Sequence, residues 1–426
     1  MTALLLRGGR RTFLSLRKHR NYRLFFSGQV VSVSGTWMQN IAMYWFVLTL
    51  THDPVAIGIL SFCRFGPFTI FGLFAGVIAD RFDNRKTVIV TQSVQMVLSA
   101  VLAIDAVTGH ATAWHVYAIA ALSGTALVLD APARQSLTFR MVGRDELPNA
   151  IPLNSSLFNI ARIAGPALGG VVIAAVGVGW CFAANAVSFL AVLTSLLLMR
   201  PAEFFPIGQH KPPTFWRGTR EGLSYVRRSR SILVILGMMV VFASLCFNFN
   251  ILLPVLAKQT LDAGPRTFGV LSAAFGFGAL IGALLAAALA RARWRTMLLG
   301  AMGFALCELA IAPVQSVPVD VLLLFACGIF FTSYTANANT RLQLDAPDHL
   351  RGRVLSLYYY AWNGLAPLGG LIVGWLSATG GTQLAFAVAG TAGLAMAITG
   401  ALAVRKPRSA PIADELAERG EELAAA

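Results

Sequence analysis

The ionisable residues of this 426-residue chain that could do chemistry are few, because charged residues make up only 12% of it. Arg64, Asp130 and Arg162 stand inside long apolar runs, where a charge is costly. A carboxylate that gains or loses an arginine partner changes its pKa, so it can bind and release a proton. Asp130 is therefore a candidate proton-coupling residue, with Arg64 and Arg162 as cationic candidates. The alternative is a permanent ion pair of Asp130 with Arg162 or Arg134.

Catalytic and metal-binding patterns are absent from the sequence. There is no H-E-x-x-H, no G-x-S-x-G and no phosphate-binding glycine loop. The cysteines are far apart in apolar stretches, without a C-x-x-C pair or a histidine at ligand spacing; they are Cys63, Cys181, Cys246, Cys307 and Cys327. We therefore expect a protein that is not an enzyme, has no disulfide framework, and binds no metal or cofactor.

The composition identifies the surroundings of these residues as a lipid bilayer. The residues AVILMFWYC make up 56% of the chain, and a soluble protein would have about 25% charged residues. The net charge of +15 comes from 34 Lys and Arg that are scattered between apolar runs. They form no continuous basic groove, so a nucleic-acid partner is not expected.

Twelve apolar runs are long enough to cross a bilayer, which takes about 20 helical residues. They predict an all-α membrane protein with twelve transmembrane helices in two pseudo-symmetric six-helix halves. The runs fall at 23–50, 54–79, 87–108, 114–138, 150–176, 179–199, 231–256, 266–290, 296–313, 319–340, 353–378 and 382–404.

The polar stretches between these runs define the expected domains. Four prolines and a short amphipathic pattern predict that the internal stretch 200–230 is a linker ending in a surface helix. The expected parts are a basic N-terminus 1–22, an N-terminal half 23–199, the linker 200–230, a C-terminal half 231–404 and a tail 405–426.

The distribution of basic residues predicts the orientation. Thirty of the 34 Lys and Arg fall on one side of the predicted spans, two on the other and two within them. The positive-inside rule then places both termini and the linker in the cytoplasm. We expect a multi-pass protein of the cytoplasmic (inner) membrane, with no feature that requires more than a monomer.

A glycine-proline motif occurs once in each half, and its glycine pair is displaced by 200 positions. Such duplication is typical of transporters whose halves rock about a site at the midplane of the membrane. We expect the motif to shape the contact between the halves, although ordinary packing of small residues is the alternative. Its members are Gly165, Pro166, Gly169, Gly170, Pro367, Gly369 and Gly370.

The end of the second span, GVIADRFDNRK at 76–86, resembles the G-x-x-x-D-[RK]-x-G-[RK]-[RK] motif of the major facilitator superfamily. Asp83 and Asn84 stand where that motif usually has a glycine and a basic residue. The stretches NYRL at 21–24, LTHDP at 50–54, DELPNA at 145–150, EGLSY at 221–225 and LRGRV at 350–354 are similar to the drug and siderophore efflux branch that includes the enterobactin exporter.

The resemblance implies a gate on the cytoplasmic side. The aspartate of the motif would face the start of the eleventh span, where helix N-terminal donors and an arginine could hold it and latch the halves together. Some of the basic residues could instead serve only as topology charges. The gate residues are Gly76, Asp80, Arg81, Arg85, Lys86, Arg351, Gly352 and Arg353.

The resemblance also implies that spans one, four, seven and ten line the transport pathway. Their polar and aromatic residues predict a cavity for an amphipathic, moderately large substrate, although helix packing alone could explain the two asparagines of span seven. Glu308 is expected to snorkel or to be solvated, because it lies near the outer end of a span that usually faces lipid. The cavity candidates are Trp37, Gln39, Asn40, Tyr44, Asn248, Asn250, Tyr334, Asn337 and Asn339.

Together these features predict a secondary active transporter that works by alternating access. The expected activity is proton-driven efflux of a drug-like or siderophore-like small molecule, with the proton as coupling ion. Two alternatives remain at this stage: transport of lipid-like cargo such as a lysophospholipid, and a membrane sensor that uses the same fold without transport.

Overall fold

The computed structural model describes residues 14–79, 82–206, 223–289, 293–347 and 350–404, and no strand occurs in them. The elements are α2 (Leu14–Lys18), α3 (Arg20–Thr51), α4 (Pro54–Ala79), α5 (Asn84–Thr108), α6 (Ala113–Val176), α7 (Val178–Leu197), the 3-10 helix η1 (Pro201–Glu203), α9 (Arg230–Val241), the π-helix η2 (Phe242–Cys246), α10 (Phe249–Val255), the π-helix η3 (Leu256–Thr260), α11 (Pro265–Leu289), α12 (Trp294–Ile311), α13 (Val317–Asp345), α14 (Arg351–Gly364) and α15 (Ala366–Val404).

Every predicted apolar range is mainly helical, with interruptions at Phe247 and Asn248 in the range 231–256 and at Leu365 in the range 353–378. In the described part of the chain, nine helical stretches are long and apolar enough to cross a membrane. Two of them, in α6 and α15, contain a break at a glycine with a positive φ: Gly143 at 71° and Gly381 at 67°. Glycine adopts this conformation without the Cβ clash that other residues suffer. The breaks separate ranges predicted as different spans, and the number of crossings itself stays a prediction.

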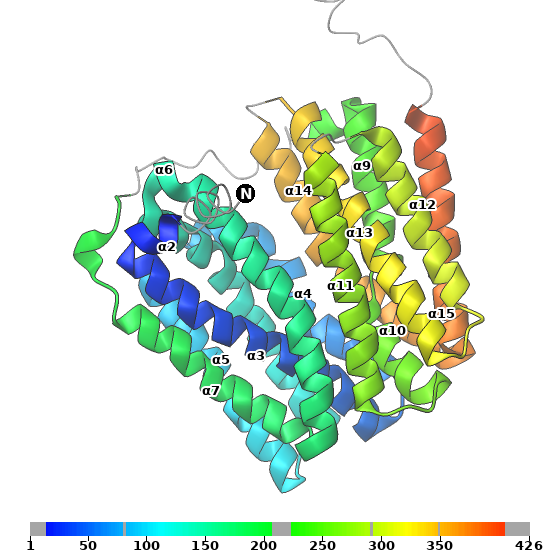
Figure 1. The fold of residues 1–426 in the computed structure, drawn as a ribbon, viewed down its shortest axis with the longest axis horizontal. Helices are drawn as coiled ribbons and strands as arrows, with labels where there is room; N and C mark the ends of the chain where they lie inside the picture. Colours follow the sequence, from blue (N-terminus) through cyan, green and yellow to red (C-terminus); the bar gives the residue numbers. More distant parts are fainter. Residues whose placement is uncertain (1–13, 80–81, 207–222, 290–292, 348–349, 405–426) are drawn as a thin grey trace, which may run out of the picture.

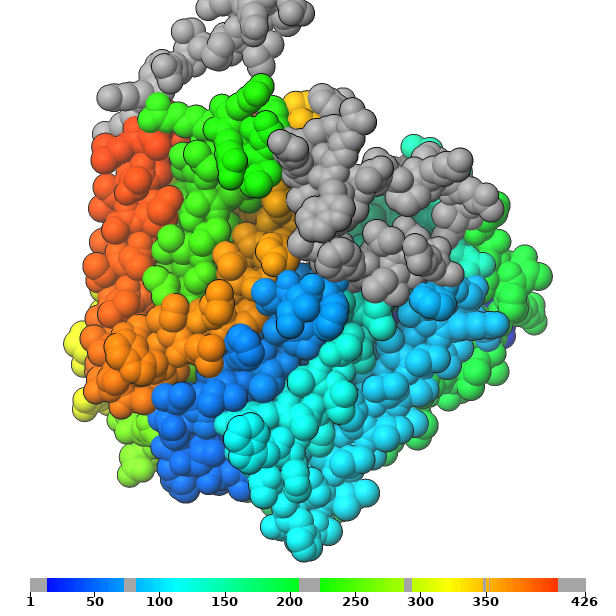
Figure 2. Space-filling view, turned by 180° about the vertical axis from the view of Figure 1, so that it is seen from behind, coloured from blue at the N-terminus to red at the C-terminus, as the bar shows by residue number. Residues whose placement is uncertain are grey.

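Two helix bundles lie side by side, α2 to α7 in one and α9 to α15 in the other (Figure 1). In the first bundle α3 packs against α6 and α7, α4 packs against α6, and α5 packs against α7. In the second bundle α13 packs against α11 and α12, and α12 packs against α15. The bundles meet along two helix pairs, α6 with α11 and α4 with α15; Figure 2 shows the second pair.

The bundles are joined at the end where α3 finishes, which is the end opposite to α2. The rings of Trp45 and Phe268 stack there at a centroid distance of 5.7 Å. Lys258 Nζ donates to the backbone oxygen of Leu48 at 3.4 Å, and Gln259 Nε2 donates to that of His52 at 3.1 Å. We call this end of the protein the closed face, and the end that carries α2 the N-terminal face.

The repeated glycine pairs divide their roles between packing within a half and packing between halves. A methyl group added to Gly170 would lie 2.8 Å from Gly269 Cα of α11, and one added to Gly58 of α4 would lie 2.7 Å from the Gly370 oxygen. The second glycine of each pair therefore touches the other half.

The first glycine of each pair packs inside its own half. A methyl group added to Gly169 would meet Met38 of α3 at 3.4 Å, and one added to Gly369 would meet the Ser244 oxygen of η2 at 1.9 Å. Gly165 likewise faces Trp37 of α3. The expectation that the whole motif shapes the contact between halves is thus corrected, because residues one position apart on a helix point about 100° away from each other. The matching division in both halves agrees with the duplication predicted from the sequence.

Candidate functional site

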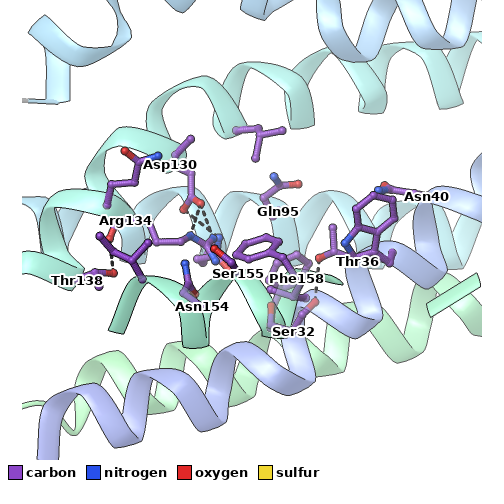
Figure 3. A pocket seen from close by; sticks show the side chains of 18 of the residues that line it. Ser32, Thr36, Asn40, Gln95, Asp130, Arg134, Thr138, Asn154, Ser155 and Phe158 are labelled. Atoms are coloured by element: carbon purple, nitrogen blue, oxygen red, sulfur yellow. Dashed lines mark hydrogen bonds and ion pairs between the residues drawn. The ribbon is translucent and has the colours of Figure 1, made fainter. Parts of the chain in front are cut away.

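A cavity of about 790 Å³ lies within the first bundle. Its walls come from α3, α4, α5, both segments of α6, and α7, and Tyr359 of α14 is the residue from the other bundle. Figure 3 shows polar side chains of several helices pointing toward one another around it. The polar and aromatic lining includes Ser32, Thr36, Trp37, Asn40, Gln92, Gln95, Gln135, Asn154 and Phe158.

An ion pair occupies one part of the wall. Arg134 Nε donates to Asp130 Oδ2 at 2.9 Å, and a second guanidinium nitrogen contacts the same oxygen. The other carboxylate oxygen accepts from Thr91 Oγ1 at 2.7 Å and from Gln92 Nε2 at 3.0 Å. Arg134 also donates to Gln29 Oε1 of α3. Asp130 is 1% exposed, and these donors satisfy both oxygens of its buried carboxylate.

Arg162 does not bind Asp130. Its guanidinium lies over the ring of Trp37, 5.2 Å from the centroid. Of the two ion pairs considered for Asp130, the one with Arg134 is therefore found and the one with Arg162 is not. Asp130 and Arg134 are four positions apart on one helix and therefore share a face. Asp130 and Arg162 stand at similar depths in neighbouring helices, but residues at equal depth need not face each other.

Arg64 lies in the cavity wall on α4. Its Nη1 contacts Met43 Sδ at 3.9 Å. Among the described residues, no carboxylate lies within ion-pair distance of Arg64 or Arg162. Both arginines are thus cations at or beside the cavity without an acidic partner in this part of the structure.

The predicted cavity residues of α3 separate into two groups. Trp37 and Asn40 line the cavity. Gln39 instead accepts a 2.8 Å hydrogen bond from Asn185 Nδ2 of α7, in the interior of the bundle. Tyr44 is 2% exposed and does not line the cavity, and its hydroxyl makes no hydrogen bond of good geometry among the described residues.

The predicted cavity residues of the second bundle do not line this cavity. Asn248 Nδ2 and Asn337 Nδ2 donate to backbone oxygens of their own helical turns, at 2.9 and 2.7 Å. Asn250 is exposed, and Asn339 accepts from Gln343 at 2.6 Å. Tyr334 is fully buried against Phe242, with ring centroids 4.6 Å apart. Helix packing, the alternative considered for the asparagines of span seven, describes Asn248.

Aromatic rings fill the interior of the second bundle. Phe247 follows the π-helix η2, where the chain leaves helical geometry at φ −88° and ψ 57°. Its ring stacks on Phe331 at 4.4 Å and lies 5.0 Å from Trp362. Large aromatic side chains bury much apolar surface, so this half has a packed centre where the first has an open cavity.

Glu308 is fully buried, and neither carboxylate oxygen has a hydrogen-bond partner among the described residues. The expectation of a snorkelling or solvated Glu308 is therefore wrong. The residue lies on the face of α12 that packs into the bundle, against α13 and α15. The expectation failed because the depth of a residue in the membrane does not show which way it faces around the helix axis.

The comparisons with known proteins identify the family. The model of the transmembrane secretion effector family of the major facilitator superfamily matches residues 12–419. The chain belongs to this family. It is a membrane transporter of the major facilitator type and not an enzyme.

Relatives and solved structures agree with this family. The chain is 26% identical to the staphyloferrin A transporter of Staphylococcus aureus, over 82% of this chain and 88% of the relative. It is also 26% identical to the enterobactin exporter EntS of Salmonella choleraesuis, over 80% and 82%. The nucleoside transporter NupG has the same fold, with a TM-score of 0.69, 14% identity, and coverage of 93% of this chain and all of NupG. The efflux branch recognised from the sequence is thus confirmed.

The gate motif of this chain is described only in part. Asp80 and Arg81 lie outside the described residues. Gly76 and Gly352 are described only as parts of their helices. Arg85 donates to the Leu196 and Leu197 oxygens at 2.9 and 3.2 Å. It therefore caps the end of α7, in addition to any effect of its charge on topology.

The basic residues near the gate also make local bonds. The backbone N–H of Lys86 donates to Asp83 Oδ1 at 3.0 Å, which caps α5, and Arg140 pairs with Asp83 at 3.2 Å. Partial burial acts to raise the pKa of Asp83, but these bonds outweigh it and hold the pKa below its usual value. In the eleventh span, α14 begins at Arg351 as expected, and Arg351 Nε donates to the Gln343 oxygen at 2.9 Å.

Several residues that line the cavity were not identified from the sequence. Gln92 and Gln95 come from α5, while Asn154, Ser155 and Phe158 come from the second segment of α6. The signal that could have found them is helical spacing, because polar residues three or four positions apart in an apolar helix share one face. The family resemblance places the transport pathway in spans one, four, seven and ten, and these residues lie in other spans.

Proposed function

We propose that this protein exports an amphipathic small molecule of the siderophore-like or drug-like class, driven by the proton gradient. The observation that carries the proposal is the cavity. Its volume of about 790 Å³ lies within the range of sites for drug-sized ligands, about 300–1,000 Å³. Aromatic rings supply apolar contacts, and amides and hydroxyls supply directed hydrogen bonds, which suits an amphipathic cargo.

Alternating access is supported by where the cavity lies. Thr138, Phe139 and Leu147 of its wall are within five residues of Gly143, the break of α6 at the N-terminal face. At the closed face the bundles touch through backbone at Gly170 and Gly58, with almost no side-chain volume between them. We assign this arrangement to the state in which the site is reached from the predicted cytoplasmic side. Separation at the closed face would give the outward-open state.

Proton coupling is proposed through Asp130. It is the acid among the described residues that line the cavity. Its carboxylate is bound by Arg134, Thr91 and Gln92 in this structure. Coupling therefore requires that the conformational change moves Arg134 away, which would raise the proton affinity of Asp130.

The proposal is tested with energised inside-out membrane vesicles that contain the full chain. We expect accumulation of at least one compound from a panel of fluorescent amphipathic molecules of cationic, neutral and anionic charge, and we expect a protonophore to abolish it. Vesicles without the protein are the control. Accumulation that a protonophore leaves unchanged would remove proton coupling, and the absence of any protein-dependent accumulation would contradict export.

A further inference from the structure

Arg64 is a cation in the cavity wall that no acid neutralises in the described structure. The contact found for its guanidinium is a thioether, Met43 Sδ, at 3.9 Å from Nη1. Guanidinium groups in proteins normally use several of their five donors, preferably with carboxylates. An arginine placed in an apolar helix without a counter-ion is costly. A bound anion would offset that cost.

Two polar atoms that have no hydrogen bond among the described residues flank Met43, the α3 residue that Arg64 contacts. Tyr44 follows Met43 on α3, is 2% exposed, and lies just outside the cavity lining. Its hydroxyl lies near Ser61, one turn before Arg64 on α4, and makes no hydrogen bond of good geometry among the described residues. Asn40, one helical turn earlier, lines the cavity and has an unpartnered side-chain oxygen. Buried polar groups are nearly always bonded, so these atoms indicate a polar group that binds between α3 and α4.

Asp130 is bound elsewhere and does not pair with Arg64. Both of its carboxylate oxygens are occupied, by Arg134, Thr91 and Gln92. Gly124 of α6 packs directly against the backbone oxygen of Arg64, and Asp130 lies six residues further along α6, about 9 Å at a rise of about 1.5 Å per residue. Among the described residues no ion pair joins Arg64 to Asp130.

The remaining charge around the cavity is positive. Asp130 and Arg134 neutralise each other, and Arg162 lies on Trp37, whose ring lines the cavity. Since neither Arg64 nor Arg162 has an acidic partner among the described residues, the cavity attracts a negative charge.

We propose that Arg64 and the Tyr44 hydroxyl form a subsite that binds a carboxylate of the substrate. The guanidinium can bind the carboxylate through two parallel hydrogen bonds, and the hydroxyl adds a third donor. The apolar part of the substrate then lies against Trp37, Phe65 and Phe158. This inference rests on the proposed function and names the charge of its cargo: an amphipathic carboxylate, and not an anionic lipid headgroup, which shares the same oxyanion chemistry.

The test compares two probes of equal shape, 1-pyrenebutyrate and its uncharged amide, 1-pyrenebutyramide. Binding to the full chain in phosphatidylcholine liposomes is measured by quenching of tryptophan fluorescence. We expect wild type to prefer the carboxylate. Arg64→Gln should weaken carboxylate binding about 10- to 100-fold, the loss typical of a charge-assisted hydrogen bond, and should leave amide binding unchanged. Tyr44→Phe should weaken carboxylate binding about 3- to 10-fold, while the exposed Arg295→Gln should change neither.

Three results would overturn the subsite. Equal affinity of wild type for both probes is the first, and it needs no variant that could misfold. Equal losses for both probes in Arg64→Gln and Tyr44→Phe are the second. The third is competition by added phosphatidylglycerol in wild type that is absent in Arg64→Gln, because it would assign the site to a lipid headgroup. Failure of the vesicle transport test with the carboxylate preference intact would contradict the proposed function and leave the subsite standing.

Discussion

Replacing Gly170 with alanine should loosen the contact that closes the two halves. The added methyl group would lie 2.8 Å from Gly269 Cα and 2.8 Å from the Pro265 oxygen, both backbone atoms of α11. Ordinary van der Waals contact begins at 3.4 Å, so α6 and α11 must separate locally by about 0.6 Å (3.4 − 2.8). Backbone atoms cannot rotate away as a flexible side chain could, so the helices themselves must move.

The expected cost follows from the overpacking of well-packed interiors, about 1–3 kcal/mol. The clash exists only where α6 and α11 touch, so it destabilises the conformation that is closed at this face and not the one that is open there. A bias of about 1–3 kcal/mol changes the ratio of two states by about 5- to 150-fold. We therefore expect Gly170→Ala to shift the population toward the open state at the closed face and to slow transport, with the fold retained.

The shift can be measured by electron spin resonance distance measurements between labels at His52→Cys and Gln259→Cys. These positions face each other across the halves, where Gln259 Nε2 bonds the His52 oxygen at 3.1 Å. Cys63, which is partly exposed, is replaced by serine. Gly169→Ala is the matched control, because its methyl group would find its nearest neighbour at 3.4 Å, in its own half. Identical distance distributions for Gly170→Ala and Gly169→Ala would refute the reasoning.

Asp130→Asn should lower the yield and thermal stability of the inserted protein, because removing one partner of a buried ion pair costs about 3–5 kcal/mol; Arg134→Gln in the same chain should restore part of it. Normal stability together with normal pH-driven efflux in Asp130→Asn would dismiss both a structural and a coupling role. Asp80→Asn should shift the population toward the inward-open state; disulfide crosslinking between the predicted cytoplasmic ends of α4 and α14 measures this, and an unchanged yield would count against a latch. Ser229→Cys should react with a membrane-impermeant maleimide in inside-out vesicles and not in intact cells, and labelling of intact cells would reverse the predicted orientation.

The sequence by itself determined the elements and their order. Twelve apolar ranges are mainly helical, because burial in lipid requires long apolar segments whose backbone hydrogen bonds are satisfied internally. The duplicated glycine pair also indicated the two-half architecture, since in each copy the first glycine packs within its own half and the second touches the other half. These features depend on composition and spacing along the chain, which can be read from the sequence.

Only the tertiary structure decided which way each side chain faces. Gln39 and Asn40 are neighbours in sequence, yet Gln39 bonds Asn185 inside the bundle and Asn40 lines the cavity. Asp130 was identified as a candidate from its type, but its binding to Arg134 and the burial of Glu308 were settled by packing. The physical reason is that a mostly apolar helix is nearly uniform around its axis, so its sequence fixes depth in the membrane, and its contacts with neighbouring helices fix its rotation.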